Sequence, residues 1–571
     1  MFFAALATDY DGTLAQHGQV DGATRRAIEE IRQSGRKLIL VTGRVLTDLA
    51  NAFGALDLFD AVVAENGALL FVPAKKEEIP LAEPPPEALV ARLRELGVTP
   101  LSVGRTIIAT WEPNETLVLK AIRDLGLEQH IIFNKGAVMV LPSEINKASG
   151  LKRALKLLRL SPHNVVGIGD AENDQAFLSS CGCAVAVNNA LPAVKSKTDF
   201  VVSDHGAGVV ELARMLTKDD LASVRPRVPR AQAVVGHTSD GAALTVSPFE
   251  TVLVTGSSGS GKSTIVTALL EQIREFSYQF CVVDPEGDYR ELRDVVTLGD
   301  SKQAPRIGEA LELLASPETS IVTNLLAIDP PERPHFLTKL LPELAKMRAV
   351  SGRPHWLVFD EVHHCLPAKW RPAPTTLPRE LPASIAVTVH PEEVAPEFLA
   401  LVSTVVGVGD GAAQAIKKFC EATGRTPPNI GVAPQAGEVL VLRCSDHIEL
   451  VTACRPKEKQ KRHVRKYAEG QLAEDKSFYF RGPERALNLR AQNLSTFLQL
   501  AAGVDDKTWL HHLRAGAYSQ WFRDTIKDDA LASEATAIEQ DHSLTPADSR
   551  ARIRDIVERR YTAPAKSRSA D

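Results

Sequence analysis

Two sets of residues suited to phosphate chemistry follow one another in this sequence of 571 residues. The first set opens with Asp9 and Asp11, two carboxylates one residue apart that come directly after an apolar run. One such carboxylate can attack phosphorus as a nucleophile, while the other moves protons to the leaving group and from water. The second set is a glycine-rich loop that begins at Gly256 and contains Lys262 and Ser263. Their order predicts two catalytic domains joined head to tail.

Two further residues of the first set could bind phosphate. Thr42 follows the apolar segment 37–41, and its hydroxyl could hold a phosphoryl oxygen at the edge of the predicted sheet. Lys147 supplies a positive point charge, both for the phosphate and for an aspartate nucleophile.

The first set also contains candidate metal ligands. Asp170 and Asp174 come directly after the apolar segment 165–169, and the carboxyl ends of parallel strands open into a shared crevice. Hard oxygen ligands such as the carboxylates of Asp9 and Asp170 and the backbone carbonyl of Asp11 suit Mg²⁺. The sequence therefore predicts a magnesium site beside the first aspartate pair.

These pieces, in this order, resemble the motifs of the haloacid dehalogenase (HAD) superfamily of phosphohydrolases. The motifs are DYDGTL at 9–14, VTGR at 41–44, EINKASGL at 144–151 and GDAEND at 169–174. The resemblance covers roughly residues 1–215.

The resemblance implies a role for each matching residue. Asp9 would be the nucleophile that forms an aspartyl phosphate, and Asp11 would be the general acid and base. Thr42 and Lys147 would bind phosphate, Asp170 would ligate magnesium, and Asp174 would support the metal shell with Asn173 close by. An Asp rather than a Thr two residues after the nucleophile favours phosphatase over ATPase chemistry within that superfamily.

A segment between the second and third motifs resembles the Cof-type, or type-two, cap of that family. It spans about residues 71–141 and includes the turn-rich sequence Glu83-Pro-Pro-Pro-Glu87. Because this insert is short, we expect a small phosphorylated metabolite as substrate, of the phosphoglycolate or sugar phosphate class.

The second set fits the pattern G-x-x-x-x-G-K-[ST] between an apolar strand at 251–255 and a helical pattern. Backbone N–H groups of such a loop wrap the phosphates of ATP, the lysine reaches the terminal phosphates, and the following serine meets Mg²⁺. The predicted nucleotide-binding residues are Gly256, Ser257, Ser258, Gly259, Ser260, Gly261, Lys262, Ser263 and Thr264.

A second acidic strand end completes this set. The apolar segment 356–359 runs into Asp360 and Glu361, the Walker B arrangement. Asp360 would hold Mg²⁺ through water, and Glu361 could polarise the attacking water, so ATP hydrolysis is predicted. A nucleotide switch that only binds ATP is the alternative.

Residues 236–455 resemble the HerA/FtsK branch of P-loop ATPases, on the additional evidence of 283–289 and the strand end at 387–390. The resemblance places Thr388 or His390 at the position of a polar sensor. The branch contains ring-forming DNA pumps that also need an arginine finger from a neighbouring subunit, for which the candidates are Arg348, Arg353 and Arg425. For His363, His364 and Cys365 we favour packing or nucleotide-linked hydrogen bonding over a metal site.

The elements that must position these residues alternate strand and helix patterns, which predicts an α/β fold. We expect a Rossmann-like HAD core with a small inserted α+β cap, then a P-loop α/β domain, then a mostly helical C-terminal segment. The predicted boundaries are 1–216 for the hydrolase, 217–236 for a linker, 237–455 for the ATPase, 456–476 for a basic connector, 477–545 for the helical segment and 546–571 for a partly flexible tail.

The amino-acid composition disfavours several classes of protein. Apolar residues make up 44%, charged residues 24%, and the net charge is −5, which disfavours a dedicated nucleic-acid binder. No apolar run reaches 18 residues, the N-terminus reads as a buried strand, and the seven cysteines fit reduced thiols, so we expect a cytoplasmic protein with no membrane span. The basic run 455–466 is interpreted as a solvated connector, with nucleic-acid contact as the alternative.

The leading hypothesis is a Mg²⁺-dependent phosphatase fused to a domain that binds and hydrolyses ATP. One rival is an ATP-driven nucleic-acid motor whose phosphatase trims phosphorylated ends. Another is a nucleotide-sensing scaffold. The sequence leaves homo-oligomer formation open.

Overall fold

The computed structural model describes most of the chain. The described residues are 1–134, 136–224, 232–289, 292–370, 377–378, 380–443, 447–457, 472, 474–484, 487–526 and 528–561. Residues 225–231 of the predicted linker and most of the basic run at 455–466 therefore lie outside the described residues.

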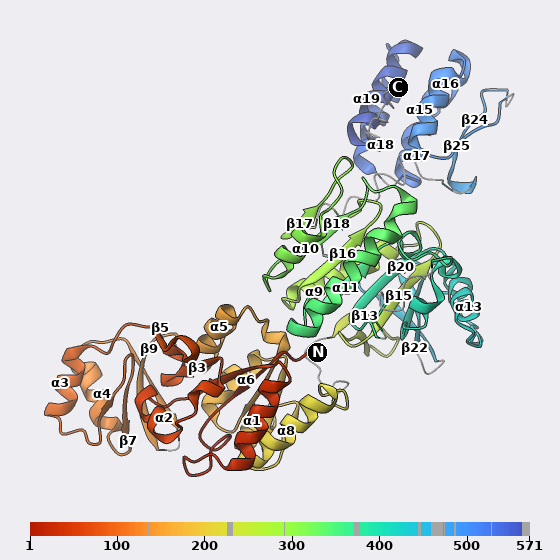
Figure 1. Ribbon diagram of the computed structural model, residues 1–571. Coiled ribbons are helices and arrows are strands. Elements are labelled where there is room, and N and C mark those ends of the chain that lie inside the picture. The colour runs from red at the N-terminus through yellow and green to blue at the C-terminus, as the bar shows by residue number, and fades with distance from the viewer. Residues whose placement is uncertain are drawn as a thin grey trace, which may run out of the picture.

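The N-terminal domain is built on a mostly parallel sheet (Figure 1). In sheet order its strands are β12 (Phe200–Val202), β11 (Cys183–Val187), β10 (Val165–Gly169), β1 (Ala5–Thr8), β2 (Lys37–Val41), β3 (Ala61–Ala64), β4 (Leu69–Val72) and β5 (Glu77–Pro80). Its helices are α1 (Gly22–Gln33), α2 (Leu46–Ala52), α5 (Lys147–Leu158), α6 (Gln175–Ser180), α7 (Pro192–Lys195) and α8 (His205–Asp219). Strand β1 is fully buried between β10 and β2, as expected for the centre of a parallel sheet.

Helix α1 shows how the sequence produces the local structure. Asp21 caps it by accepting a hydrogen bond from the Thr24 backbone N–H, and Ala27, Ile28 and Ile31 form its buried face against the sheet.

The insert forms a separate small sheet covered by helices. The sheet runs in the order β6 (Ser102–Val103), β7 (Ile108–Trp111), β9 (Ala137–Pro142) and β8 (Gln129–Asn134), with α3 (Glu87–Glu95) and α4 (Glu115–Asp124). Strands β4 and β5 instead extend the main sheet. The insert is therefore shorter at its start than the predicted 71–141, because the turn between β4 and β5 returns the chain to the core before the cap begins.

The central domain contains a second, larger sheet. In sheet order its strands are β14 (Ala243–Val246), β13 (Ala233–His237), β23 (Ile448–Ala453), β22 (Glu438–Arg443), β21 (Thr404–Val408), β15 (Thr251–Gly256), β20 (Ser384–Thr388), β19 (Trp356–Phe359), β16 (Phe280–Asp284), β18 (Ser320–Asn324) and β17 (Val295–Leu298). Its helices are α9 (Lys262–Glu275), α10 (Ile307–Leu314), α11 (Arg333–Ser351), α12 (Pro396–Leu399) and α13 (Ala412–Thr423).

Both ends of the predicted linker 217–236 lie in regular structure. Helix α8 continues to Asp219, and β13 begins at Ala233 and pairs with β14 and β23 of the central sheet. The central domain therefore starts before residue 237.

The C-terminal domain combines a short hairpin with helices. Its elements are β24 (Phe478–Phe480), β25 (Leu489–Ala491), α15 (Leu494–Gly503), α16 (Asp506–Arg514), α17 (Ala517–Asp524), α18 (Asp529–Gln540) and α19 (Pro546–Arg560). Helix α19 buries Ile553, Ile556 and Val557 in the same core as Trp509 and Phe522. Residues 546–560 are thus an integral helix of this domain rather than part of a flexible tail.

The two large sheets meet through the residues that precede their strands. Asn164, just before β10, donates a 2.8 Å hydrogen bond to the Phe2 carbonyl, and its Oδ1 lies 3.0 Å from Nε2 of His355, just before β19. The ring of Phe2 also packs edge-on against Phe249, which precedes β15. Because the strands start at this contact, their carboxyl ends point away from it. The C-terminal helices stand at the far side of the central sheet from the N-terminal domain (Figure 1).

Within the described part of the chain, no helix combines the length and the apolar character needed to cross a membrane.

Candidate functional site

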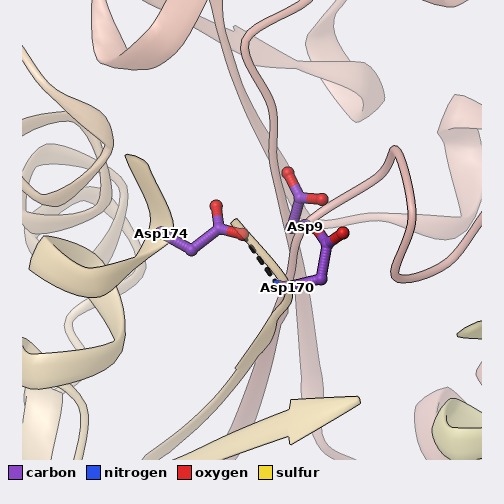
Figure 2. A group of neighbouring side chains, drawn as sticks. All are labelled: Asp9, Asp170 and Asp174. Atoms are coloured by element: carbon purple, nitrogen blue, oxygen red, sulfur yellow. Dashed lines mark hydrogen bonds between the residues drawn. The ribbon is translucent and has the colours of Figure 1, made fainter. Parts of the chain in front are cut away.

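Three buried aspartates converge at the carboxyl ends of β1 and β10 (Figure 2). Asp9 follows β1, while Asp170 and Asp174 follow β10, and one carboxylate oxygen of each lies within 4.8 Å of the others. Hard carboxylate oxygens brought together in this way are the ligand set that Mg²⁺ prefers. These residues therefore fit the metal ion that the sequence predicts.

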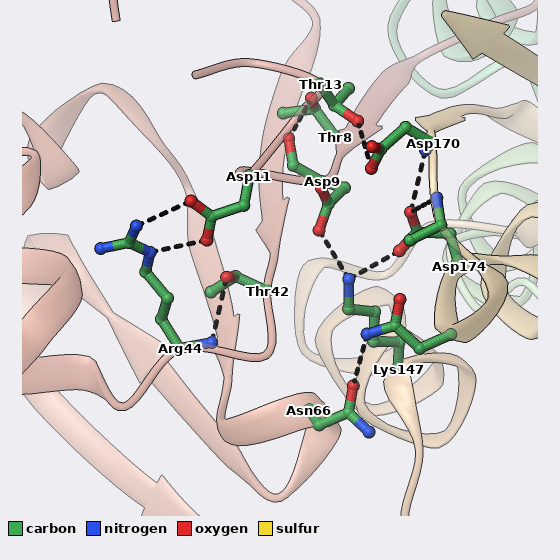
Figure 3. A network of polar contacts seen from close by, with 12 residues as sticks. Thr8, Asp9, Asp11, Thr13, Thr42, Arg44, Asn66, Lys147, Asp170 and Asp174 are labelled. Carbon is green, nitrogen blue, oxygen red and sulfur yellow. Dashed lines mark hydrogen bonds and ion pairs between the residues drawn. The ribbon is translucent and has the colours of Figure 1, made fainter. Parts of the chain in front are cut away.

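Lys147 is the positive charge among these aspartates (Figure 3). It is the first residue of α5, and its Nζ lies 2.6 Å from Oδ1 of Asp9 and 2.6 Å from Oδ1 of Asp174. When all three carboxylates are ionised, the single ammonium leaves two excess negative charges, which a divalent cation would neutralise. The pKa of Asp9 is raised to about 8 by burial and by the neighbouring Asp174 carboxylate, while Lys147 acts in the opposite direction.

Asp174 is held by the backbone at the end of β10. Its Oδ2 accepts hydrogen bonds of 2.9 Å from the N–H groups of Asp170 and Ala171, while Oδ1 faces Lys147. These two backbone donors fix the orientation of the carboxylate. Asp174 therefore positions Lys147 and closes the metal-binding group.

Asp11 projects differently from Asp9. Its two carboxylate oxygens accept hydrogen bonds of 2.6 and 2.7 Å from Nε and a terminal nitrogen of Arg44, a bidentate pair on the side of Asp9 away from Lys147 (Figure 3). Thr42, buried after β2, accepts a 3.2 Å hydrogen bond from the Arg44 backbone N–H. The sequence prediction missed Arg44 as a site residue, although it ends the VTGR motif.

The cap is anchored to the core beside this site. Glu65 is fully buried, and its carboxylate accepts hydrogen bonds from the backbone N–H groups of Arg105 and Thr106 at 3.0 and 2.8 Å. Met139 of β9 lies so close to Gly43 that a Cβ placed on the glycine would be 3.5 Å from the Met139 thioether. The cap therefore packs against the core at Gly43, the residue that follows Thr42.

The glycine-rich loop lies between β15 and α9, as predicted. Gly261 has a φ of +106°, and a Cβ at Gly256 would lie 2.2 Å from the Val408 carbonyl oxygen, so both positions require glycine. Lys262 Nζ donates to the carbonyls of Gly256 and Ser257 at 3.2 and 3.0 Å. Among the described residues the buried hydroxyl of Ser260 has no hydrogen-bond partner, as expected for a group that awaits a polar ligand. The glycines, the lysine and the hydroxyl of this loop suit the phosphates of a nucleoside triphosphate.

The acidic partners of this loop follow β19. Asp360 is buried, and its pKa is raised well above the usual range by burial and by the adjacent Glu361. Glu361 adopts a positive φ of 35°, and its Oε2 is buried with no hydrogen-bond partner among the described residues. Backbone strain and a carboxylate without a partner are both expected of a residue that binds a water molecule in the active site.

Neighbouring polar residues connect this carboxylate to β20. His363 Nδ1 lies 3.5 Å from Glu361 Oε2 and 3.0 Å from Thr388 Oγ1. Thr388 Oγ1 also accepts a hydrogen bond from the His390 backbone N–H. Burial, together with His390 and Lys262, lowers the pKa of His363 to about 4. The neutral imidazole thus hydrogen-bonds the predicted sensor residue Thr388 and lies beside the acidic strand end without bonding to it.

The three candidate arginine fingers serve other purposes within the chain. The Arg348 guanidinium donates to the carbonyls of Pro354, His355, Pro382 and Ala383, before β19 and β20. Arg353 donates to the carbonyls of Leu314 and Arg159, and Arg425 to the carbonyl of Val402. Arg348 and Arg353 lie at the amino ends of the strands, opposite the nucleotide loop of the same chain, and the role predicted for them toward a neighbouring subunit stays a prediction.

Comparison with known proteins agrees with this geometry. Residues 6–96 and 115–212 match the family model of haloacid dehalogenase-like hydrolases, and residues 249–349 match the model of the central domain of helicase HerA. The N-terminal domain is therefore similar to haloacid dehalogenase-like hydrolases. The chain as a whole joins this hydrolase-like domain to a HerA-like domain.

Individual relatives match the N-terminal domain. A phosphoglycolate phosphatase from Methanothermobacter thermautotrophicus is 29% identical over 221 residues, which cover 37% of this chain and 97% of the relative. One from Halorubrum lacusprofundi is 29% identical over 209 residues, covering 35% and 90%. Among solved structures, a haloacid dehalogenase-like hydrolase from Bacteroides thetaiotaomicron is 18% identical with a TM-score of 0.33, covering 38% of this chain and 99% of that one.

Proposed function

We propose that the N-terminal domain is a Mg²⁺-dependent phosphatase of small phosphorylated metabolites, with phosphoglycolate as the first candidate substrate. The observation that carries this proposal is the buried group of Asp9, Lys147, Asp170 and Asp174 at the strand ends. The substrate class is proposed from the relatives, which are phosphoglycolate phosphatases. The cap residue Met139 packs at Gly43 beside this buried group, which places the cap next to the phosphate-binding residues.

In this mechanism an Oδ atom of Asp9 attacks phosphorus, and the bond from phosphorus to the leaving oxygen breaks. Asp11 donates a proton to that oxygen, and glycolate would leave as the alcohol. Asp11 then takes a proton from water, which attacks the aspartyl phosphate and releases inorganic phosphate and Asp9. Lys147 keeps Asp9 oriented and offsets its negative charge, and Thr42 holds a phosphoryl oxygen. A bound Mg²⁺, held by Asp9, Asp170, Asp174 and the Asp11 carbonyl, would neutralise charge on the transferring group.

The test is phosphate release from phosphoglycolate and a panel of sugar phosphates, with Mg²⁺ and with a chelator. Asp9→Asn should lower turnover of the best substrate by roughly a thousandfold or more, because the amide cannot act as a nucleophile. Lys262→Ala is the matched control, since it alters the other domain and should leave phosphate release unchanged. Turnover that survives Asp9→Asn would contradict the nucleophile assignment.

We further propose that the central domain binds and hydrolyses ATP. The supporting observations are the glycine-rich loop with its unsatisfied Ser260 hydroxyl and the unsatisfied carboxylate of Glu361 after β19. Lys262 and Ser260 would bind phosphate, Ser263 and Asp360 would hold Mg²⁺, and Glu361 would polarise the attacking water. Glu361→Gln separates the two alternatives. Retained ATP binding with lost hydrolysis supports an ATPase, whereas a wild-type protein that binds ATP without turnover is a nucleotide switch.

A further inference from the structure

One residue of the C-terminal domain reaches the nucleotide loop of the central domain. Lys476, which lies two residues before β24, has its Nζ 3.4 Å from the Ser258 carbonyl oxygen. A Cβ placed on Gly259 would lie 3.5 Å from the same Nζ. The ammonium group therefore rests against the tip of the loop, more than 200 residues away in the sequence.

The backbone of Lys476 is fixed by the aromatic core of its own domain. Trp521 Nε1 donates a 3.0 Å hydrogen bond to the Lys476 carbonyl. The next two residues, Ser477 and Phe478, are buried, and the Phe478 ring packs against Phe497 and Trp521. The side chain of Lys476 is exposed, so its end can move while its base stays in place.

The contact between Lys476 and the loop resembles the contact that Lys262 makes. Both ammonium groups donate to carbonyl oxygens of the loop, Lys262 to Gly256 and Ser257, and Lys476 to Ser258. A neutral carbonyl is a weaker partner for an ammonium than a polyanion, because full charges of opposite sign attract each other by Coulomb's law. A triphosphate in this loop would therefore compete for both lysines.

We propose that Lys476 is a second cationic ligand of the nucleotide, supplied in cis by the C-terminal domain. The ligand is a nucleoside triphosphate, and the proposal rests on the nucleotide binding proposed above. No neighbouring subunit is needed for this charge, in contrast to an arginine finger supplied in trans. The same contact makes the C-terminal domain a cover that docks more firmly when the loop is filled.

The test compares three substitutions at one position in the full-length protein. Lys476→Gln keeps hydrogen-bond donors but removes the charge, Lys476→Ala removes the group, and Lys476→Arg restores a cation. The equilibrium dissociation constant for ATP, measured by calorimetry at low salt, should rise about tenfold in the first two, and Lys476→Arg should stay within about threefold of wild type. Lys507→Ala, an exposed lysine on α16 of the same domain, is the control and should not change ATP affinity.

The outcomes separate this proposal from the one on which it depends. Loss of ATP binding in Lys262→Ala together with unchanged binding in Lys476→Gln would overturn the Lys476 assignment alone. A wild-type protein that does not bind ATP would overturn both. An equal loss in all three Lys476 variants, with Lys476→Arg no better than Lys476→Ala, would also overturn it, since that pattern indicates disruption of the fold rather than loss of charge.

Discussion

The two proposed phosphate sites of this chain are assembled in opposite ways. In the N-terminal site, Asp9, Lys147 and Asp174 come from three separate segments, are all buried, and already contact one another. In the central site, most ligands come from one continuous loop, and the buried oxygens of Ser260 and Glu361 have no hydrogen-bond partner within the described chain. The first site gathers carboxylates that suit a cation. The second presents Lys262 and the Ser260 hydroxyl to a polyanion, while its Glu361 carboxylate suits water. The two sites should therefore respond differently to mutation and to pH.

Lys147→Ala should have the largest effect of the predictions made from this comparison. Removing one partner of a buried ion pair costs about 3–5 kcal/mol, and here it leaves three buried carboxylates without a cation. We expect phosphatase activity to fall by roughly a hundredfold or more and the N-terminal domain to unfold at a lower temperature, with Mg²⁺ restoring part of the loss. Lys152→Ala, an exposed lysine on the same helix, should behave like wild type. Wild-type activity in Lys147→Ala would show that the ammonium is dispensable.

The stability of the metal-free protein should depend on pH through the titration of Asp9. Its pKa is raised from 3.8 to about 8 on folding, so the unfolded chain loses this proton at a lower pH than the folded one. Stability of the metal-free protein should therefore fall between about pH 4 and 8, with a slope of up to about 1.4 kcal/mol per pH unit from this group. Other buried carboxyls such as Asp360 contribute in the same direction. The measurement is thus the difference in unfolding temperature between wild type and Asp9→Asn across this range, and a difference that does not change with pH would contradict the assignment.

Ser260→Ala should have the smallest effect, and it should weaken ATP binding without lowering thermal stability. Without nucleotide, the alanine removes a buried hydroxyl that lacks a partner, so thermal stability should be unchanged or raised by up to about 1 kcal/mol. The dissociation constant for ATP should rise several-fold, because a phosphate ligand is lost. A lower melting temperature in the absence of ATP would show that this hydroxyl already has a structural partner.

Much of the N-terminal site follows from the sequence because strand ends carry it. The strand predicted at 165–169 is β10, with the same bounds, and the carboxylates that follow β1 and β10 converge as a parallel sheet requires. Arg44 was missed because nothing in its local pattern shows that it turns back to Asp11. Its partner is visible only once β1 and β2 lie side by side.

Other features depended on contacts that the sequence hides. Strand β21 was not predicted, because its short run Thr404–Val408 is rich in valine but is interrupted by Gly407, is followed by Gly409 and lacks a polar alternation. Helix α19 was taken for a tail because its sequence is highly charged, and its buried residues are few. Lys476 was assigned to a basic connector, where one lysine cannot be told from its neighbours without the fold.

The meeting of the two sheets at their amino ends has a kinetic consequence. Ligands enter the two sites from opposite ends of the two sheets, and the buried residues Asn164 and His355 pair where the sheets meet. A molecule released by one domain must therefore diffuse through bulk solvent before it can reach the other. The two reactions should run without channelling, so a competing enzyme added to the solution would intercept any shared intermediate.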